Sequence, residues 1–571
     1  MSAGRAQFEV QIWQNKHWVL DVIFDNENAA VKAAQSMAKA GGGGFEEVRV
    51  IKSWMRSDGA TTDTTVYSEK VSNSDRPVNI TPIDDAPHCI VADDLYNAES
   101  RRCVGRLLRK YLDKLFITPT ELMHCHRHSK TLAEKDNLLP SAVDRVATIQ
   151  SKKSGEDYNK RRDELFRFVE GISSRAKNIE NSRSLPVINE GDFTAMVKAV
   201  DYTAAADTRG FFILAALSQM MRFSRSWLDK LAALLDLNCI GTDDPTFAYI
   251  DQLIGEVLDS AAAIQEVFGP QACLGAAIAQ MLDLSNGVLM VNGREPHEPL
   301  AGLKKLFATR PMTQSRASLV DRVKKEIGGT GKLARNQEDE GQQFAEVIGR
   351  LLDKNGNIVG GIDMVEAIMA RTGLKIGASG DTISPRERVT EVMTLIDDPR
   401  NRVKFLVLVS ETTFGKKNTS VVVDITGQII MPCKSVEELC YFRDPPTKKL
   451  RDIAGLQRQI LGSSFPDKER ALMADRLDTI LADFIIRDKI IEKMDNPNDS
   501  LRDRATRLVQ FCASGMLTEG KALTMARERT LSYLRQPNFI GHFTENVSDA
   551  ARKEEMIRDF YRLLAKAGMS G

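Results

Sequence analysis

The chain of 571 residues has no excess of charge of either sign, because 78 lysines and arginines balance 78 aspartates and glutamates. A protein that coats nucleic acid or an anionic membrane surface needs a basic excess. The balance therefore excludes general nucleic-acid binding and leaves only local basic patches. The length is too great for one hydrophobic core and predicts several domains.

Paired cysteines are also missing. The eight cysteines are scattered, and no two of them form a CxxC pair. Scattered cysteines in a long chain are typical of reduced and mostly buried thiols, which indicates a reducing compartment. The first residues, MSAGRAQFEVQIW, do not combine a charged segment with an apolar one, so we expect no secretory signal and a cytoplasmic location.

Long apolar runs are missing as well. The most apolar segments, 211–223 and 272–284, both contain polar residues. Each is shorter than the run of about 20 residues that spans a bilayer. We therefore expect both segments to be buried core helices and predict no membrane span.

What the chain contains is divided unevenly along its length. Three of the four tryptophans, Trp13, Trp18 and Trp54, lie in the first seventy or so residues. In the same region apolar residues alternate with polar ones, which is typical of half-buried strands. After about residue 90 the apolar residues recur with helical spacing, so a small α/β unit is expected to precede a helical body.

The first unit is predicted to contain two strands, a helix and two further strands. The strands are expected at 7–14, 17–24, 47–54 and 64–71. Asp25 can cap the helix, and the glycine run at 41–44 can end it. The residues expected to share a face within one element are Phe8, Val10 and Ile12; Trp18, Leu20, Val22 and Phe24; and Ala30, Ala33, Ala34 and Met37.

The order of the segments FEVQIW, NENAAVKAA and FEEVRVI resembles that of small sheet-plus-helix binding modules such as the SPOR peptidoglycan-binding repeats. The resemblance covers only this first unit, and no functional motif accompanies it. It implies a small α/β fold for the unit and no function for the chain.

Capping signals mark the start of two helices. Thr118-Pro119-Thr120-Glu121 combines an N-cap, a proline at the first helical position and a capping-box glutamate, and 384–387 repeats this pattern. An amphipathic helix is predicted at 94–116. Its apolar stripe is Val104, Leu107, Leu108, Tyr111, Leu112 and Leu115. Further helices are predicted at 158–179, 211–223, 227–237, 247–262 and from 445 to the end.

The predicted fold is therefore mainly α: a multi-helix body preceded by a small N-terminal α/β (ββαββ) module. Two segments rich in β-branched residues, 403–409 and 420–431, could be strands or buried helices, because periodicity does not decide for short apolar runs. The predicted domain ranges are 1–72 for the α/β module, 73–92 for a linker, 93–187 and 188–312 for helical domains, 313–400 for a helical segment and 401–571 for a mostly helical C-terminal domain.

The tightest group of potential metal ligands is the run from His124 through Cys125 to His128. On one continuous helix Glu121, His124 and His128 would share a face and could hold a divalent metal. The alternative places Cys125 in the core and the histidines on its polar flank. We favour the alternative, because the sequence has no HExxH motif and no evident fourth ligand, and we predict no metal and no cofactor.

A glycine-rich segment at 328–332 invites comparison with a phosphate-binding loop. That motif needs glycine where Glu326 stands and serine or threonine where Leu333 stands. We therefore expect a turn between two helices instead.

The segment at 353–357 resembles the opening of a calcium-binding EF-hand loop. The sixth position, which needs glycine, is Ile358, and the twelfth, which needs glutamate, is Met364. A turn between Leu352 and Ile358 is the favoured interpretation.

The densest basic surface is expected on the helix at 101–114. Such a face is normally only solvated, and no nucleic-acid motif or aromatic stacking pair accompanies it. Whether it binds an anionic partner stays open at this stage. Its members are Arg101, Arg102, Arg106, Arg109, Lys110 and Lys114, with Arg127 nearby.

These patterns favour a bacterial-type cytoplasmic regulatory or scaffolding protein that acts through contacts with a protein partner. A first alternative is a signalling protein in which the small module or 403–431 senses a small molecule or nucleotide. A second is an enzyme whose site assembles from distant residues. No catalytic, cofactor-binding or metal-binding residue is predicted, a non-enzymatic role is favoured, and the partner and the oligomeric state stay open.

Overall fold

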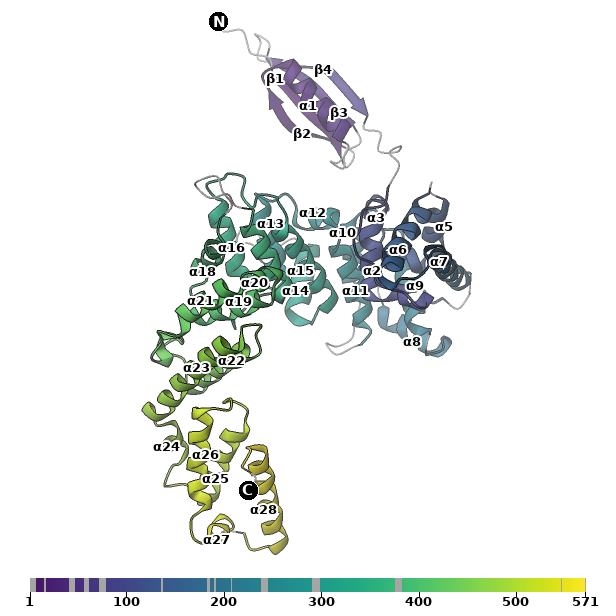
Figure 1. Ribbon diagram of the computed structural model, residues 1–571. Helices are drawn as coiled ribbons and strands as arrows, with labels where there is room; N and C mark the ends of the chain where they lie inside the picture. Colours follow the sequence, from purple (N-terminus) through teal and green to yellow (C-terminus); the bar gives the residue numbers. More distant parts are fainter. Residues whose placement is uncertain are drawn as a thin grey trace. The chain divides into compact units, whose positions relative to one another are not determined.

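The structure is a computed structural model, and it is mainly α-helical with a small antiparallel sheet at the N-terminal end (Figure 1). It confirms the predicted fold class. The residues that it describes are 7–14, 17–40, 47–55, 61–70, 79–134, 137–181, 185–188, 192–206, 208–237, 245–289, 298–374, 383–545 and 547–569.

The described chain divides into two compact units. The smaller unit comprises 1–95, 106–115 and 127–170, and the larger unit comprises 96–105, 116–126 and 171–571. The six predicted domain ranges, from 1–72 to 401–571, remain predictions.

The N-terminal module has the predicted ββαββ order. Its elements are β1 (Gln7–Gln14), β2 (His17–Phe24), α1 (Glu27–Ala40), β3 (Glu47–Met55) and β4 (Thr61–Lys70). The described strands form an antiparallel sheet in the order β2-β1-β3-β4, so β2 and β4 lie at its edges. The fourth strand begins three residues earlier than predicted, at Thr61 instead of residue 64.

A β-bulge changes which side chains of β2 share a face. Val22 pairs with Val10 but Leu20 pairs with Gln11, so Asp21 is the extra residue of β2. Directly opposed residues of an antiparallel pair point to the same face. Leu20 therefore shares the face of Gln11, whereas Val22 shares the face of Val10, which packs on α1. The prediction that Trp18 and Leu20 lie on the same side as Val22 and Phe24 is wrong, because an inserted residue reverses the alternation.

Helix α1 covers one face of the sheet through small side chains. Ala30 and Ala34 are fully buried against Val10, Val48 and Val50, and the close approach follows from the size of alanine. The cap is Asn26 and not Asp25, because the backbone N–H groups of residues 28 and 29 donate to its side-chain oxygen. The predicted glycine stop at 41–44 lies outside the described residues.

The second half of the predicted linker at 73–92 packs on helices of the smaller unit. Ile83, Ala86 and Cys89 are buried. The side chain of Arg145 donates to the carbonyl of Ile83 at 2.9 Å, and that of Arg161 donates to the carbonyl of Cys89. From residue 79 on, this segment is therefore held by the helices that carry Arg145 and Arg161, which span 138–154 and 158–180.

The remaining elements that the structure describes, apart from an isolated bridge, are helices. Up to residue 235 they are η1 (Ala92–Tyr96), α2 (Ala98–Leu107), α3 (Arg109–Leu115), α4 (Pro119–His124), α5 (His126–Glu134), α6 (Leu138–Ser154), α7 (Tyr158–Glu180), α8 (Phe193–Thr203), α9 (Arg209–Met221) and α10 (Trp227–Leu235). The single helix predicted at 94–116 is thus divided into η1, α2 and α3, while the helix predicted at 158–179 is confirmed as α7.

The middle of the larger unit confirms the capping signal at 384–387 and settles the two ambiguous segments as helices. Ser384 and Glu387 form the reciprocal capping box of α18. The ambiguous segments lie in α19 and α21. The elements are α11 (Phe247–Leu258), α12 (Ala261–Phe268), α13 (Leu274–Ser285), α14 (Glu298–Thr309), α15 (Thr313–Gly328), α16 (Glu340–Leu351), α17 (Gly361–Thr372), α18 (Pro385–Thr394), α19 (Pro399–Glu411), α20 (Thr413–Lys417) and α21 (Thr419–Ile430).

The end of the chain is helical, as predicted. It comprises η2 (Val436–Glu438), α22 (Pro446–Leu461), α23 (Asp467–Arg487), α24 (Ile490–Met494), α25 (Leu501–Ala513), α26 (Lys521–Leu534), α27 (Phe539–Phe543) and α28 (Ala550–Lys566).

One continuous apolar core joins the helices of the larger unit from α8 to α28. Its largest fully buried side chains include Trp227, Phe193, Phe344 and Phe405. The two most apolar segments of the sequence belong to this core, as α9 and α13. No helix in the described part of the chain combines the length and the apolar character that a bilayer crossing requires.

The thiols of Cys433, Cys440 and Cys512 are also buried in this unit. Burial raises the pKa of all three thiols, that of Cys440 to about 11. Buried protonated thiols are the form expected of reduced structural cysteines.

Candidate functional site

The predicted capping box at Thr118 forms and starts the fully buried helix α4. The backbone N–H of Glu121 donates to Oγ1 of Thr118 at 3.1 Å, and the backbone N–H of Thr118 donates to Oε2 of Glu121 at 2.8 Å. Pro119 occupies the first turn, where its missing N–H costs nothing. All six residues of α4 are buried, so the polar groups that it carries need partners inside the protein.

Glu121 finds its partner in Lys230 of α10. Nζ of Lys230 lies 2.5 Å from Oε1 of Glu121, and neither side chain is exposed by more than 1%. The same ammonium group donates to the carbonyl of Met221 at 3.3 Å. This buried ion pair joins α4 to the helices of the larger unit, and it engages the carboxylate that was the first candidate metal ligand.

His124 is a core histidine in the larger unit, so the expectation that it lies on a polar flank beside Cys125 is wrong. Its Nδ1 lies 2.8 Å from the carbonyl oxygen of Thr120, and its ring packs on Phe211 and Tyr96 at centroid distances of 4.4 and 5.1 Å. Burial lowers the pKa of His124 to about 3, and the positive charges of Arg101 and Arg175 lower it further. The imidazole is therefore neutral at physiological pH.

The predicted face of Glu121, His124 and His128 is not formed. The chain leaves the helical conformation at Cys125, which caps α4 with extended backbone angles, and α5 starts a new helix at His126. A spacing of seven residues therefore no longer places two side chains on one face. Within the described residues, no three histidine, cysteine, aspartate or glutamate side chains gather as metal ligands would.

Neutral His124 makes the stability of the larger unit depend on pH. In the unfolded chain its pKa returns to about 6.5, so the unfolded state binds a proton that the folded state rejects. Stability is therefore complete above about pH 6.5 and falls as the pH decreases toward 3, by about 2 kcal/mol between pH 7 and pH 5.

We expect His124→Phe to remove this dependence, because the phenyl ring keeps the aromatic packing and cannot be protonated. The measurement is urea unfolding at pH 7 and pH 5. The same substitution at His542, whose side chain is 56% exposed, is the control and should leave the difference unchanged. An equal acid sensitivity of the wild type and His124→Phe would contradict the neutral buried imidazole.

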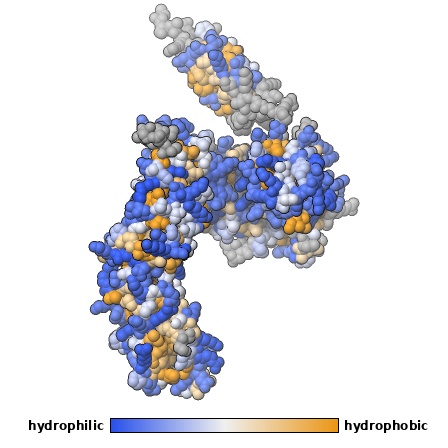
Figure 2. Space-filling view, in the orientation of Figure 1, coloured by the Kyte–Doolittle hydropathy of each residue, from blue (hydrophilic) through white to orange (hydrophobic). Residues whose placement is uncertain are grey.

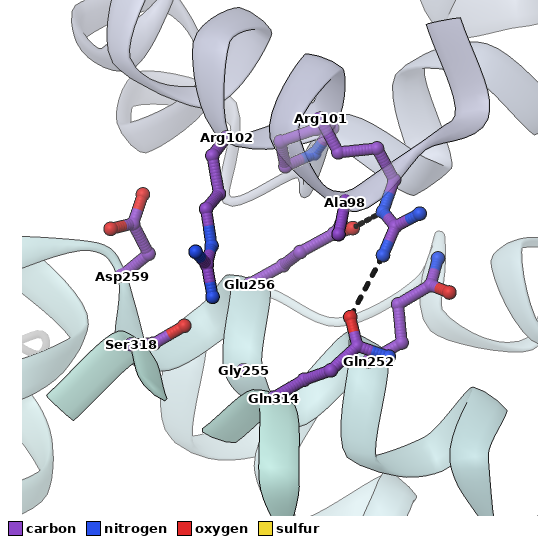
Figure 3. Close-up of a pocket in the computed structure, with 10 residues that line it drawn as sticks. Ala98, Arg101, Arg102, Gln252, Gly255, Glu256, Asp259, Gln314 and Ser318 are labelled. Atoms are coloured by element: carbon purple, nitrogen blue, oxygen red, sulfur yellow. Dashed lines mark hydrogen bonds and ion pairs between the residues drawn. The ribbon is translucent and has the colours of Figure 1, made fainter. Parts of the chain in front are cut away.

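The carboxylate of Glu256 on α11 is surrounded by hydrogen-bond donors, among them the side chain of Arg101 (Figure 3). Nε of Arg101 lies 2.7 Å from Oε1 of Glu256, and the backbone N–H and hydroxyl of Thr120 donate to the same carboxylate at 2.9 and 2.7 Å. Burial raises the pKa of Glu256, while Arg101 and Thr120 oppose that rise. The amide of Gln252 donates to Oγ1 of Thr120 at 2.8 Å, so the donors and acceptors of this group satisfy one another.

Helices α11 and α15 hold this group in place. A side chain at Gly255 would put its Cβ 3.0 Å from the backbone of Gln314, so glycine permits the close approach of the two helices. Asp251 accepts the backbone N–H groups of Gln314 and Ser315 at 2.8 and 3.0 Å, which caps the start of α15. Oε1 of Gln314 then accepts a hydrogen bond from Arg101 at 2.9 Å.

A small cavity of about 20 Å³ lies beside Glu256. Such a volume holds one water molecule, whereas pockets for metabolites or nucleotides are at least an order of magnitude larger, roughly 300 Å³ and above. Because Arg101, Gln252, Glu256 and Gln314 are hydrogen-bonded within the protein, these lining residues stabilise the packing of α4 and offer little to a substrate. The lining residues are Ala98, Arg101, Arg102, Pro119, Gln252, Gly255, Glu256, Asp259, Gln314 and Ser318.

The predicted basic face at 101–114 is not a single exposed surface. Arg101 is buried against Glu256, Arg102 lies 3.6 Å from a carboxylate oxygen of Asp321, and Arg109 lies 3.4 Å from one of Asp113. Arg106, Lys110 and Lys114 are exposed. The prediction failed for Arg101 because its partner lies 155 residues away in the sequence.

The glycine-rich segment at 328–332 is a turn between two helices, as predicted. The guanidinium group of buried Arg371 donates to the carbonyls of Ile327, Gly329 and Gly331 at 2.8, 3.3 and 2.8 Å. A phosphate-binding loop presents backbone N–H groups to its ligand, whereas this turn directs carbonyl oxygens to a cation. Arg371 also contacts Glu340. The carboxylate of Glu340 accepts the backbone N–H groups of residues 333 and 334 at 3.1 and 2.9 Å.

The segment at 353–357 is likewise the expected turn. The carboxylate of Asp353 accepts the backbone N–H groups of Asn355 and Asn357 at 2.7 and 2.8 Å, and Leu352 pairs with Ile358 across the turn. These N–H donors lower the pKa of Asp353. The Asp353 carboxylate therefore stabilises the turn through these hydrogen bonds.

Two exposed apolar features stand apart from these internal groups. Leu20, Val22 and Ile23 lie exposed on edge strand β2, with relative accessibilities of 48%, 36% and 47%. Tyr441 and Phe442, at 63% and 84%, lie on a turn between η2 and α22. In Figure 2 apolar surface is visible over the part of the module where Figure 1 places β1 and β2. Sequence reasoning missed both features, because exposure at an edge or turn depends on what packs nearby.

No family model matches the chain, and no curated protein or solved structure is significantly similar to it. The resemblance of the first unit to SPOR repeats therefore stays one of pattern only.

Proposed function

We propose that this protein is a cytoplasmic regulatory or scaffolding protein that acts through protein–protein contacts, and that a partner binds at the edge of the N-terminal sheet. The observation that carries the proposal is the composition of β2. It is an eight-residue edge strand, HWVLDVIF, in which the large apolar side chains of Leu20, Val22 and Ile23 are exposed.

An edge strand with apolar side chains invites pairing, because its outer N–H and C=O groups have no strand partner in the sheet. Natural sheets usually protect such edges with charged or polar residues. The other edge strand here, β4, follows that rule with the sequence TTDTTVYSEK. The contrast between the two edges supports pairing of β2 with an extended segment of another protein, a common mode of recognition.

The charged groups described above on α4, α11 and α15 are engaged in holding helices together. The buried thiols of Cys433, Cys440 and Cys512 fit a reducing compartment such as the cytoplasm. A large body of packed helices with exposed apolar features on ordered elements suits a protein that brings partners together.

The test is affinity capture of the tagged full chain from its own cells, followed by mass spectrometry. We expect the double variant Leu20→Lys/Ile23→Lys to lose a partner that the wild type retains, with recovery reduced by about tenfold or more, because a loss of 1.4 kcal/mol already has that effect. Lysine is well tolerated on an edge strand, so the module should keep its fold.

Ile362→Lys provides the matched control. Ile362 lies on α17 and is exposed to a similar degree, 45%. A reproducible partner set that neither variant changes would remove β2 from the proposal. If the wild type captures no protein reproducibly, the proposed function itself is wrong.

A further inference from the structure

A second exposed apolar feature is a hydrogen-bonded turn that presents two aromatic side chains. The backbone N–H of Asp444 donates to the carbonyl of Tyr441 at 3.1 Å, so Phe442 and Arg443 form the tip of a four-residue turn. The preceding residues Leu439 and Cys440 are buried, which anchors the turn to the core of the larger unit. Figure 2 shows apolar surface in the region where Figure 1 places α21 and α22, the helices that flank this segment.

Basic side chains of α19 and α22 contact the residues of the turn. The guanidinium carbon of Arg400 lies 5.5 Å from the ring centre of Tyr441, and its Nη1 lies 3.6 Å from Oδ2 of Asp444. Nζ of Lys448 contacts the same carboxylate at 2.7 Å. Nζ of Lys449 lies 5.7 Å from the ring centre of Phe442. Because the turn is already ordered, a partner would lose little conformational entropy on binding its tip.

Near the turn, the carboxylates have cationic partners, but two of the cations have no carboxylate partner among the described residues. Arg400 is within ion-pair distance of Asp398, Asp444 and Asp452, and Lys448 is within that distance of Asp444 and Asp452. Glu437 pairs with Lys449 and Arg487. Each of these carboxylates therefore has a cationic partner within the protein.

Two exposed arginines near the turn have no ion-pair partner of this kind in the described part of the chain. Among the residues that the structure describes, no carboxylate lies within ion-pair distance of Arg443 or Arg451. Arg443 lies at the tip of the turn, and Arg451 follows Lys448 by three residues on α22, so it lies on the same side of that helix. The surface of the turn thus combines an exposed aromatic ring with two arginines that no described carboxylate pairs with.

We infer that the 441–444 turn docks an acidic segment of a partner protein, in which apolar side chains receive Phe442 and flanking carboxylates pair with Arg443 and Arg451. This inference rests on the proposed function and names the class of partner for a second surface. Aromatic and arginine side chains together are the residue types that dominate binding energy at protein interfaces. Arginine favours carboxylates because its planar donors fit them in pairs.

The experiment uses a random dodecapeptide library displayed on phage, selected on the full chain. We expect the enriched peptides to combine aspartate or glutamate with leucine, phenylalanine or tryptophan. The synthesised peptides should bind Phe442→Ala and the double variant Arg443→Glu/Arg451→Glu at least tenfold more weakly than wild type. Phe442 is too exposed for its loss to affect folding, and an unchanged thermal melt verifies this.

Tyr561→Ala is the matched control, since Tyr561 is an aromatic residue of α28 in the same unit with 57% exposure. It should bind the peptides as the wild type does. Enrichment without acidic residues, or peptides that bind both turn variants like the wild type, would overturn the inference. Loss of self-association in Phe442→Ala by sedimentation would also overturn it, because the turn would then be a contact between two copies of this chain.

Failure of this inference is distinguishable from failure of the proposed function. If wild-type chain captures protein partners that depend on β2 while the turn variants change nothing, only the docking turn is wrong. If the wild type captures no partner at all, the broader proposal fails with it.

Discussion

Lys230→Met is expected to lower the free energy of unfolding of the larger unit by about 3–5 kcal/mol, because it leaves a buried carboxylate without its cation. Glu121 is fully buried, and Nζ of Lys230 donates a hydrogen bond to its carboxylate at 2.5 Å. Methionine matches the length of the lysine stem, so packing is largely kept and the effect reports the charge. Urea unfolding followed by circular dichroism measures it.

Two further variants isolate the cause. In Glu121→Gln/Lys230→Met most of the stability should return, since glutamine carries no charge and still accepts the backbone N–H of Thr118. Lys305→Met, at an exposed position of α14, should change stability by no more than about 0.5 kcal/mol. If Lys230→Met behaved like Lys305→Met, the buried ion pair would not be what secures α4.

The second large effect is expected at the glycine-rich turn. Arg371→Met should destabilise the larger unit by about 3 kcal/mol or more, because several carbonyls and the carboxylate of Glu340 lose a charged donor at once. Unfolding by urea provides the measurement.

Lys332 supplies the comparison, because it would bind phosphate if the turn were a nucleotide site. It is exposed, so Lys332→Met should stay within about 0.5 kcal/mol of the wild type. A turn that tolerated Arg371→Met, in a chain that bound ATP in a Lys332-dependent manner, would reverse our assignment of this segment.

The features that sequence reasoning predicted well depend on residues close together in the chain. The capping boxes at Thr118 and Ser384 form as expected, because each needs only four consecutive residues. The N-terminal ββαββ order follows from alternation and turn residues of the same local kind. A mainly helical body follows from helical spacing repeated over many segments.

The errors arose where one residue interrupts a regular pattern. The bulge at Asp21 reverses the faces of β2, and the break at Cys125 separates His124 from the helix that carries His128. In each case the pattern on both sides of the interruption is correct. Periodicity assumes that an element is continuous, so it does not reveal an inserted or non-helical residue inside it.

The pairings that define the candidate sites could not be predicted for a different reason. Glu256 lies 155 residues from Arg101, and Lys230 lies 109 residues from Glu121. Nothing in one sequence indicates which of many charged residues meet in the fold. The segments 403–409 and 420–431 stayed ambiguous for another reason, because periodicity does not distinguish a short buried strand from a buried helix; both lie in helices that pack in the common core.

The central claim is that the edge of the N-terminal sheet contacts another protein. Site-specific photocrosslinking in the protein's own cells tests it most directly, with a photoreactive residue in place of Ile23 on β2 and, as control, in place of Ile362 on α17. The account predicts a discrete protein adduct from position 23 and none of that mass from position 362. Equal adducts from both positions, or no protein adduct from position 23, would contradict it.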